Sequence, residues 1–470
     1  MLFHFADNVN ATPFSSLVKL LALFGGIAIA LYALFCLVGR GRAMQAANAA
    51  FVLFLFFHTY GIAFNGLYAW DVIRVEHYTL LPLFILLGLQ LAWLISRLSI
   101  KNANNFWQGA TIIISVLVVF NLVKIASAEI RRYSALGNVP TAVPSLNTNG
   151  NKKYPDIYFL IFDEMEGFEG MRQYWHYNQV DSFVEFLKSN GFYDAEGSNS
   201  SSQTTFHEIA NRLNYQAFPY VWGSAEGSAT DMAAISNNKV MKYLKSLGYT
   251  TIVFSELRSD FIFPSAPPIK ADYLFEKPET GVSTAAFDDF SRLVMSYTML
   301  KPFFAEINLA AVKQHKDMIY FTVEKIGHLE NIPGPKFIYM HLALPHEPFL
   351  FQANGSLNPP QDYRNWNDYL GNYIFAQQMA EKVITSIKAS ADPSRPLVII
   401  MQSDHGARNA LVTPADVPLL NYPVKYKHLI VNALYLPGCD QSVLTQDMNP
   451  INTFPIIFNC YFNAGIPLLK

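Results

Sequence analysis

The sequence predicts an N-terminal α-helical membrane domain followed by an α/β domain with a mainly parallel sheet flanked by helices. The chain of 470 residues is 51% hydrophobic and only 15% charged, and its long uncharged runs lie before residue 130. After residue 154, short apolar strands alternate with helical patterns, which is typical of a parallel sheet covered on both faces. The formal net charge of −2 gives no indication of a nucleic-acid partner.

Four stretches before residue 130 are long enough to cross a bilayer, which takes roughly 20 apolar residues each. They cover residues 16–38, 46–68, 78–95 and 109–126. Arg40 and Arg42 lie between the first and second stretches, and Arg97 and Lys101 lie between the third and fourth. Positively charged loops stay in the cytoplasm, so the N-terminus and everything after the fourth stretch are expected outside the cytoplasmic membrane.

This pattern divides the chain into three parts. We expect a membrane domain over residues 1–130, a linker rich in Asn, Pro and Ser over residues 131–153, and an extracytoplasmic domain over residues 154–470. A transporter would need polar or charged groups inside its spans. Apart from Asn65 and Gln90 the four stretches offer few, which disfavours a transporter.

The expected α/β domain has strands at residues 156–162, 249–255, 336–342, 395–402 and 429–437. Helices are expected at residues 180–191 and 237–248, each closed by a glycine, and at residues 370–390. Ligands of such sheets sit beyond the carboxyl ends of the strands, so the polar residues at those ends are the first candidates for a site.

Three strand ends carry carboxylates or imidazoles. They are Asp163 and Glu164, then His341 and His346, then Asp404 and His405. A mixed set of carboxylate and imidazole ligands suits Zn²⁺ or Mn²⁺ better than a cation that prefers oxygen alone. Each residue also has an ordinary explanation as a turn former or helix cap, so spacing alone leaves a metal site and a polar edge equally open.

The segment "SNSSSQTTFHEIANRLN", residues 198–214, contains a helix whose apolar face begins just after Thr205. One interpretation is a capping box, in which Thr205 is the N-cap and Glu208 reaches back to it. The other is catalytic, because a hydroxyl at a helix N-terminus beside a divalent metal is a potential nucleophile. Taken alone, the segment favours the capping box.

Together, "DIYFLIFDE", "SQTTFHEIANRLN", "HLALPHEPF" and "SDHG" resemble the alkaline-phosphatase/sulfatase superfamily. Within it they resemble membrane-anchored enzymes such as lipoteichoic acid synthases and lipid A phosphoethanolamine transferases. The resemblance covers residue 154 to the C-terminus and implies an alkaline-phosphatase/sulfatase-like domain. It also implies that Asp163, Thr205, Asp404 and His405 bind one divalent metal ion, with Thr205 as the nucleophile and His346 on the substrate side. His341 is interpreted as a polar strand residue.

The resemblance implies a transferase that moves a phosphorylated headgroup from a membrane phospholipid to an envelope glycan or glycolipid through a covalent threonine intermediate. A sulfatase-like or phosphodiesterase hydrolase would share the same residues, and a non-catalytic envelope protein with this fold would bind no metal. The formylglycine motif of true sulfatases is not found near Thr205, which disfavours sulfate-ester hydrolysis. Counting forward from "SQT" selects Thr204 as the nucleophile instead. We favour Thr205, because an insertion inside the helix would rotate its buried face.

Two further expectations concern the ends of the chain. Membrane enzymes of this kind commonly have five spans, which leaves open whether the sequence is naturally short or incompletely started. Cys439 and Cys460 are the only cysteines outside the spans, in a compartment where disulfides persist. A disulfide between them and two free thiols are equally open, since their geometry cannot be read from the sequence.

Overall fold

The computed structural model describes residues 1–7, 9, 14–38, 42–69, 76–136, 153–219, 225–255, 269–275, 289–346, 349–358, 366–407, 426 and 428–469. The chain forms two compact units. The helical unit contains residues 1–131, 260–265 and 279–313, and the α/β unit contains residues 132–259, 266–278 and 314–470.

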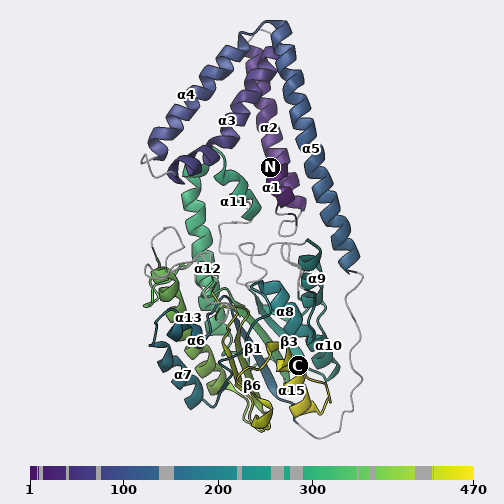
Figure 1. The fold of residues 1–470 in the computed structure, drawn as a ribbon, viewed down its shortest axis with the longest axis vertical. Coiled ribbons are helices and arrows are strands. Elements are labelled where there is room, and N and C mark those ends of the chain that lie inside the picture. The colour runs from purple at the N-terminus through teal and green to yellow at the C-terminus, as the bar shows by residue number, and fades with distance from the viewer. Residues whose placement is uncertain are drawn as a thin grey trace. The chain divides into compact units, whose positions relative to one another are not determined.

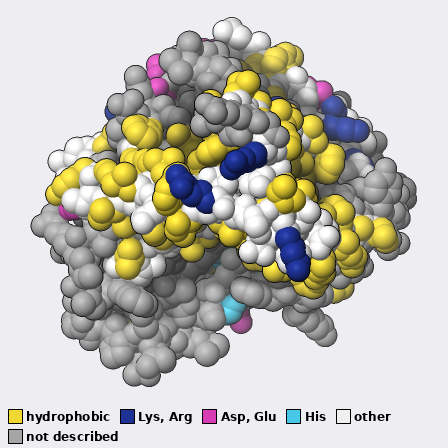
Figure 2. Space-filling model, turned by 90° about the horizontal axis from the view of Figure 1, so that it is seen from above, with side chains coloured by type: hydrophobic (Ala, Val, Ile, Leu, Met, Phe, Trp, Pro, Cys, Tyr) yellow, Lys and Arg dark blue, Asp and Glu magenta, His cyan; other side chains and the backbone are white. Residues whose placement is uncertain are grey.

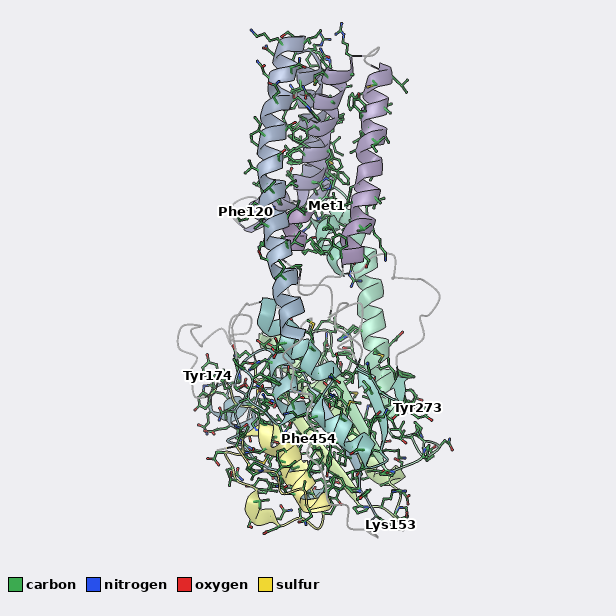
Figure 3. All side chains as sticks on the ribbon, turned by 90° about the vertical axis from the view of Figure 1, so that its right-hand side faces the viewer. Met1, Phe120, Lys153, Tyr174, Tyr273 and Phe454 are labelled. Atoms are coloured by element: carbon green, nitrogen blue, oxygen red, sulfur yellow. A yellow bond between two sulfur atoms is a disulfide. The ribbon has the colours of Figure 1, made fainter. Side chains whose placement is uncertain are left out.

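The helical unit contains four long helices (Figure 1): α2 (Phe14–Val38), α3 (Ala43–Ala69), α4 (His77–Ser96) and α5 (Ile100–Leu136). Each includes a stretch long and apolar enough to cross a membrane, so the four predicted spans are found as helices. Large hydrophobic side chains on these helices are exposed, as Figure 3 shows for Phe120, which is 66% exposed on α5. A surface of this kind suits lipid rather than water. Helix α5 continues to Leu136, into the range expected to be a linker.

Three basic residues lie at the turns at one end of the helical unit. Arg42, Arg97 and Lys101 lie where α2 gives way to α3 and where α4 gives way to α5. Figure 2, which looks onto this end, shows Lys and Arg side chains among hydrophobic ones. The opposite end carries α1 (Leu2–Asp7) together with α11 (Asp289–Ser296), η2 (Lys301–Phe304) and the start of α12 (Ala305–Lys325). The sequence between two strands of the α/β unit therefore contributes to the helical unit.

The α/β unit is built on one sheet of seven strands among the described residues, in the order β2-β7-β6-β1-β5-β3-β4. The strands are β1 (Asp156–Phe162), β2 (Tyr193–Asp194), β3 (Thr250–Ser255), β4 (Tyr273–Phe275), β5 (Lys336–Leu342), β6 (Leu397–Ser403) and β7 (Asn432–Tyr435). Strands β6, β1, β5, β3 and β4 run parallel, while β7 is antiparallel to both β6 and β2. The predicted mainly parallel sheet is confirmed.

The centre of the sheet explains the apolar runs of the sequence. Every residue of β1 and β5 is buried, because helices cover both faces of the sheet (Figure 1). One face carries α6 (Phe168–Gln173), α7 (Val180–Ser189) and α13 (Trp366–Ser390). The other carries α8 (Thr205–Asn214), α9 (Ala225–Ser236), α10 (Lys239–Ser246) and α15 (Thr453–Phe462). Phe454 of α15 packs edge-on against Phe159 of β1, with ring centroids 5.1 Å apart.

Several local predictions are confirmed. The helices expected at residues 180–191 and 237–248 are α7 and α10, followed by Gly191 and Gly248 with φ of +80° and +85°. These left-handed conformations explain the two glycines. The pairing of Cys439 and Cys460, which the sequence left open, is a disulfide with Cα atoms 5.7 Å apart. The shorter pieces near it are the 3₁₀ turns η4 (Gln441–Val443) and η5 (Pro450–Asn452).

The order of the strands determines where the candidate site residues lie. The two neighbours of β1 are β5 and β6, which lie on opposite sides of it and come later in the chain. Ligand sites of open parallel sheets lie at such a switch point, beyond the carboxyl ends of the strands. Phe162, the last residue of β1, pairs with Leu342 of β5 and with Ser403 of β6. The residues that follow these strands therefore emerge side by side.

Candidate active site

Asp163, Asp404 and His405 come together at the carboxyl ends of β1 and β6. All three side chains are buried, and one ligand atom from each lies within 4.8 Å of the other two. The placement follows from the register of β1 and β6, in which Phe162 pairs with Ser403. Asp163 directly follows Phe162, and Asp404 directly follows Ser403. Two carboxylates and an imidazole in one buried cluster form a set that can hold a divalent metal ion.

The orientation of His405 fixes which nitrogen faces this cluster. His405 Nδ1 lies 2.8 Å from the carbonyl oxygen of Gly406, and a carbonyl can only accept a hydrogen bond. The proton of the neutral ring is therefore on Nδ1, and Nε2 carries a lone pair. Nε2 lies 3.4 Å from Asp404 Oδ2 and 3.8 Å from Asp163 Oδ1. This is the tautomer that a metal-binding histidine needs.

The two carboxylates each use one oxygen for structure and leave the other toward His405. Asp404 Oδ1 accepts hydrogen bonds from the amides of Glu164, at 3.0 Å, and His405, at 2.8 Å. Asp404 Oδ2 and Asp163 Oδ1 are buried and have no hydrogen-bond donor among the described residues. Buried carboxylate oxygens without a donor are costly unless a cation compensates them. The donor set therefore fits a metal ion between these oxygens and His405 Nε2.

Asp163 is held by a chain of buried groups on β5. Its Oδ2 lies 3.3 Å from Nε2 of His341, whose Nδ1 lies 3.1 Å from the hydroxyl of Tyr339. Burial by itself raises the pKa of Asp163, but His346 and the other nearby histidines outweigh it and hold that pKa well below its usual range. His341, interpreted from the sequence as a polar strand residue, thus contacts a candidate metal ligand directly.

Thr205 brings a hydroxyl to the same cluster. Its Oγ1 lies 3.5 Å from His405 Nε2, and the side chain is buried. The capping-box interpretation is wrong: Thr204 is the N-cap of α8 and Thr205 is the first helical residue. Glu208 is therefore one position too far along the helix for a capping box, and its Oε1 accepts bonds from Ser202 N and Ser201 Oγ instead. The Thr205 hydroxyl has no capping role.

Arg212 fastens α8 to the end of β6, and sequence reasoning missed it. Its fully buried guanidinium donates to the carbonyl oxygens of Ser403, at 2.7 Å, and Asp404, at 2.6 Å. Glu208, one turn earlier on α8, lies 3.4 Å from the same guanidinium and balances its charge. The spacing of four between Glu208 and Arg212 was the available signal. This arrangement fixes Thr205 relative to Asp404.

The loop after β1 is held from α13. The hydroxyls of Tyr369 and Tyr373 donate to the carbonyl oxygens of Glu164 and Glu166, each at 3.0 Å. Glu166 Oε2 accepts from the amide of Ala407 at 2.8 Å, which joins the loop carrying Asp163 to the loop carrying His405. None of these three contacts follows from a sequence motif.

His346 lies at the edge of the cluster rather than within it. Its Nε2 is 3.8 Å from Glu164 Oε2, and its side chain is 12% exposed, whereas that of Glu164 is fully buried. His315 on α12 was not predicted. Burial and the nearby His346 lower the pKa of His315 to about 4, although a hydrogen bond with the Ala343 backbone acts in the opposite direction. His346 is thus the histidine of this group that reaches solvent.

No protein-family model matches this chain, and no curated protein matches it in sequence. Solved structures with a similar fold include the C-terminal periplasmic domain of EcEptC from Escherichia coli in complex with Zn. Its TM-score is 0.43 at 14% identity, over 68% of this chain and 87% of that one. Another is the integral membrane lipooligosaccharide phosphoethanolamine transferase A from Neisseria meningitidis. Its TM-score is 0.44 at 11% identity, over 83% of this chain and 70% of that one. A Vibrio parahaemolyticus protein in the alkaline phosphatase superfamily has a TM-score of 0.39 at 13% identity, over 71% of this chain and 74% of that one.

Proposed function

We propose that this chain is a metal-dependent transferase that moves a phosphorylated headgroup from a membrane phospholipid to an envelope glycan or glycolipid. The observation that carries the proposal is the position of Thr205 Oγ1, 3.5 Å from His405 Nε2 and beside two buried carboxylate oxygens that lack donors. A hydroxyl in that position is poised to act as a nucleophile. The motifs that resemble the alkaline-phosphatase/sulfatase superfamily are the ones that supply these residues.

One divalent ion would be held by Asp163, Asp404, His405 and Thr205. The mixture of carboxylate, imidazole and hydroxyl donors suits Zn²⁺ or Mn²⁺. When bound, the ion would lower the pKa of the Thr205 hydroxyl and neutralise charge on phosphoryl oxygens. The positive end of the α8 macrodipole lies at Thr205, the first residue of the helix, and favours negative charge there as well.

Transfer would take two displacements at phosphorus. In the first, the Thr205 hydroxyl loses its proton to solvent, its oxygen bonds to phosphorus, and the bond from phosphorus to the lipid oxygen breaks. His346, at the solvent-facing edge of the cluster, gives a proton to the departing lipid alkoxide. In the second, an acceptor hydroxyl gives its proton to His346 and bonds to phosphorus, while the bond from phosphorus to the Thr205 oxygen breaks and that oxygen takes a proton from solvent. A hydrolase would use water at this second stage.

We place the α/β unit outside the cytoplasmic membrane. The positive charges of Arg42, Arg97 and Lys101 gather at one end of the helical unit, the end that stays in the cytoplasm. The disulfide between Cys439 and Cys460 suits an oxidising compartment on the other side. A reporter fused after Lys153 is expected to be exported, and one fused at Lys101 to be cytoplasmic.

Mass spectrometry of envelope lipids and glycans tests the function, comparing cells that have the protein, lack it, or carry Thr205→Asn. We expect the protein alone to produce a glycan or glycolipid with an added phosphorylated headgroup, together with the lipid alcohol left behind. Release of the headgroup into solution without a modified acceptor would show a hydrolase. Identical lipids and glycans in all three strains would refute catalysis of either kind.

A further inference from the structure

The chain segment between α11 and η2 is hydrogen-bonded to the main chain of α3. The amide of Gly61 donates to the carbonyl oxygen of Tyr297 at 2.8 Å, and the amide of Met299 donates to the carbonyl oxygen of Phe57 at 2.9 Å. Gly61 and Phe57 lie one turn apart on α3, so the two bonds join the segment to a single turn of the helix. We call residues 297–299 and their partners Phe57 and Gly61 the main-chain clamp.

Gly61 is required for this clamp. A Cβ at position 61 would collide with Ser296 O and lie 2.6 Å from the Cα of Tyr297. The clamp also falls within the apolar stretch of α3, Ala43–Leu67, where irregular backbone must find its hydrogen bonds inside the protein. Residues 297–299 are thus fixed against a membrane-spanning helix.

The clamp brings Lys301 to the end of that stretch. Lys301 Nζ donates to Asn65 Oδ1 at 2.7 Å and lies 5.4 Å from the centroid of the Phe64 ring. Asn65 stands two residues before the end of the apolar stretch, or about 3 Å at the helical rise. This is the level at which lipid headgroups meet the hydrocarbon, on the side away from Arg97 and Lys101.

Lys301 is a half-buried cation with no anionic partner in the described part of the chain. Within the described part of the chain no carboxylate forms an ion pair with it, and its bonded partner is a neutral amide. Burial lowers its pKa, as expected for a cation whose charge is not compensated. An anion supplied from outside the chain would remove this cost.

A second donor stands beside Lys301. The ring of His77, the first residue of α4, stacks on Phe64 with centroids 3.8 Å apart, and its Nδ1 lies 2.8 Å from the Tyr60 hydroxyl. When the Tyr60 hydroxyl donates to Nδ1, the proton of the ring is on Nε2. The ammonium and the imidazole are therefore gathered around one aromatic ring at the edge of the apolar stretch.

We propose that Lys301, together with Asn65 and His77, binds the phosphodiester of a phospholipid headgroup in the outer leaflet. Phe303, which is 68% exposed two residues after Lys301, adds apolar surface for the acyl chains. The ligand class follows from the surroundings, because at the end of a membrane span the abundant anion that also carries an apolar part is a phospholipid. As a donor site the inference rests on the proposed function, but the binding itself needs no turnover.

Native mass spectrometry of the full chain in detergent tests this, with phosphatidylethanolamine, phosphatidylglycerol and diacylglycerol of the same acyl chains as probes. We expect both phospholipids to be retained and diacylglycerol to be lost. Lys301→Gln should weaken phospholipid retention about tenfold or more, because a charge-assisted hydrogen bond is removed. Lys301→Arg should retain binding, which separates the effect of charge from misfolding.

Lys19→Gln is the matched control, since Lys19 is an exposed cation near the start of α2 at the same end of the unit. It should bind phospholipid like the wild type, and excess inorganic phosphate should displace nothing. Retention of diacylglycerol, wild-type binding by Lys301→Gln, or displacement by inorganic phosphate would each overturn the site. The two proposals remain distinguishable. A wild type that binds phospholipid but transfers nothing would refute only the proposed function, whereas wild-type binding by Lys301→Gln would refute only the site.

Discussion

Thr205 Oγ1 lies 3.5 Å from His405 Nε2, although the two residues are 200 positions apart in the chain. The hydroxyl comes from the first residue of a helix and the nitrogen from the loop after the sixth strand. Arg212 joins the two elements by donating to the carbonyl oxygens of Ser403 and Asp404. The cluster thus combines a potential nucleophile with three potential metal ligands on a rigid, buried support.

Replacing Asp163 or Asp404 by Asn should lower the metal content of the purified protein by at least tenfold. Either change removes the negative charge of an oxygen that has no other partner among the described residues. Elemental analysis by mass spectrometry after dialysis checks this. Asp231→Asn is the control, because Asp231 is also buried beside a histidine, His207 at 3.3 Å, but is not in the cluster. Full occupancy in both site variants would return Asp404 and His405 to the status of a polar loop.

Gly61→Ala should release the main-chain clamp. The new methyl group would collide with Ser296 O, and breaking two buried backbone bonds costs roughly 2 kcal/mol before any strain is counted. Chymotrypsin should then cleave after Tyr297, within the released segment, faster than in the wild type. Gly66→Ala is the matched control, since nothing lies within 4 Å of a Cβ at that position. Equal cleavage of the two variants would argue against the clamp.

Asp194 should make the α/β unit less stable as the pH rises. Burial, with a smaller contribution from the charge of Glu196, raises the pKa of Asp194 to about 7 from the model-compound value of 3.8. The folded protein therefore binds a proton that the unfolded chain releases, and this stabilisation is full below about pH 4 and lost as the pH rises through 7. At pH 8, Asp194→Asn should raise the free energy of unfolding by roughly 1–4 kcal/mol and therefore raise the thermal midpoint. At pH 4 it should change both quantities little.

The exposed Asp447 provides the control for this effect. Asp447→Asn should leave the difference between the thermal midpoints at pH 4 and pH 8 the same as in the wild type. An Asp194→Asn protein with the same pH dependence as the wild type would show that Asp194 is already ionised in the folded state at pH 4.

The disulfide between Cys439 and Cys460 should stabilise the α/β unit by roughly 3 kcal/mol, given the 21 residues that separate the two cysteines. A reducing agent should lower the thermal midpoint of the wild type and leave that of the Cys439→Ser/Cys460→Ser protein unchanged. Alkylation of both thiols in the unreduced wild type would contradict the pairing.

The sequence was sufficient for the parts of the fold that depend on local patterns. Strands β1, β5 and β6 are continuous apolar runs, and their polar successors had to meet once the strands paired in parallel. Asp163 and Asp404 were therefore accessible to sequence reasoning. The capping-box interpretation failed because it depended on the first residue of α8, and helix ends shift by one residue without changing the apolar pattern.

Contacts between distant segments were beyond that reasoning. Arg212 and Tyr369 act on main-chain carbonyls, which every residue carries, so no residue type marks their partners. Gly61 likewise looks like any glycine in an apolar span until Tyr297 is found against it. His341 required the register of β5 against β1, which places it beside Ile161 and within reach of Asp163.

The central claim is that Thr205 is the nucleophile, and trapping its phosphorylated adduct tests this most directly. The protein is incubated with a phospholipid donor without acceptor, digested and analysed by mass spectrometry. We predict the added phosphorylated headgroup on Thr205 in the wild type and in Thr204→Asn, and no adduct in Thr205→Asn, which has lost the attacking hydroxyl. Thr205→Ser should retain some adduct formation. An adduct on Thr204, or transfer activity that survives in both asparagine variants, would contradict the claim.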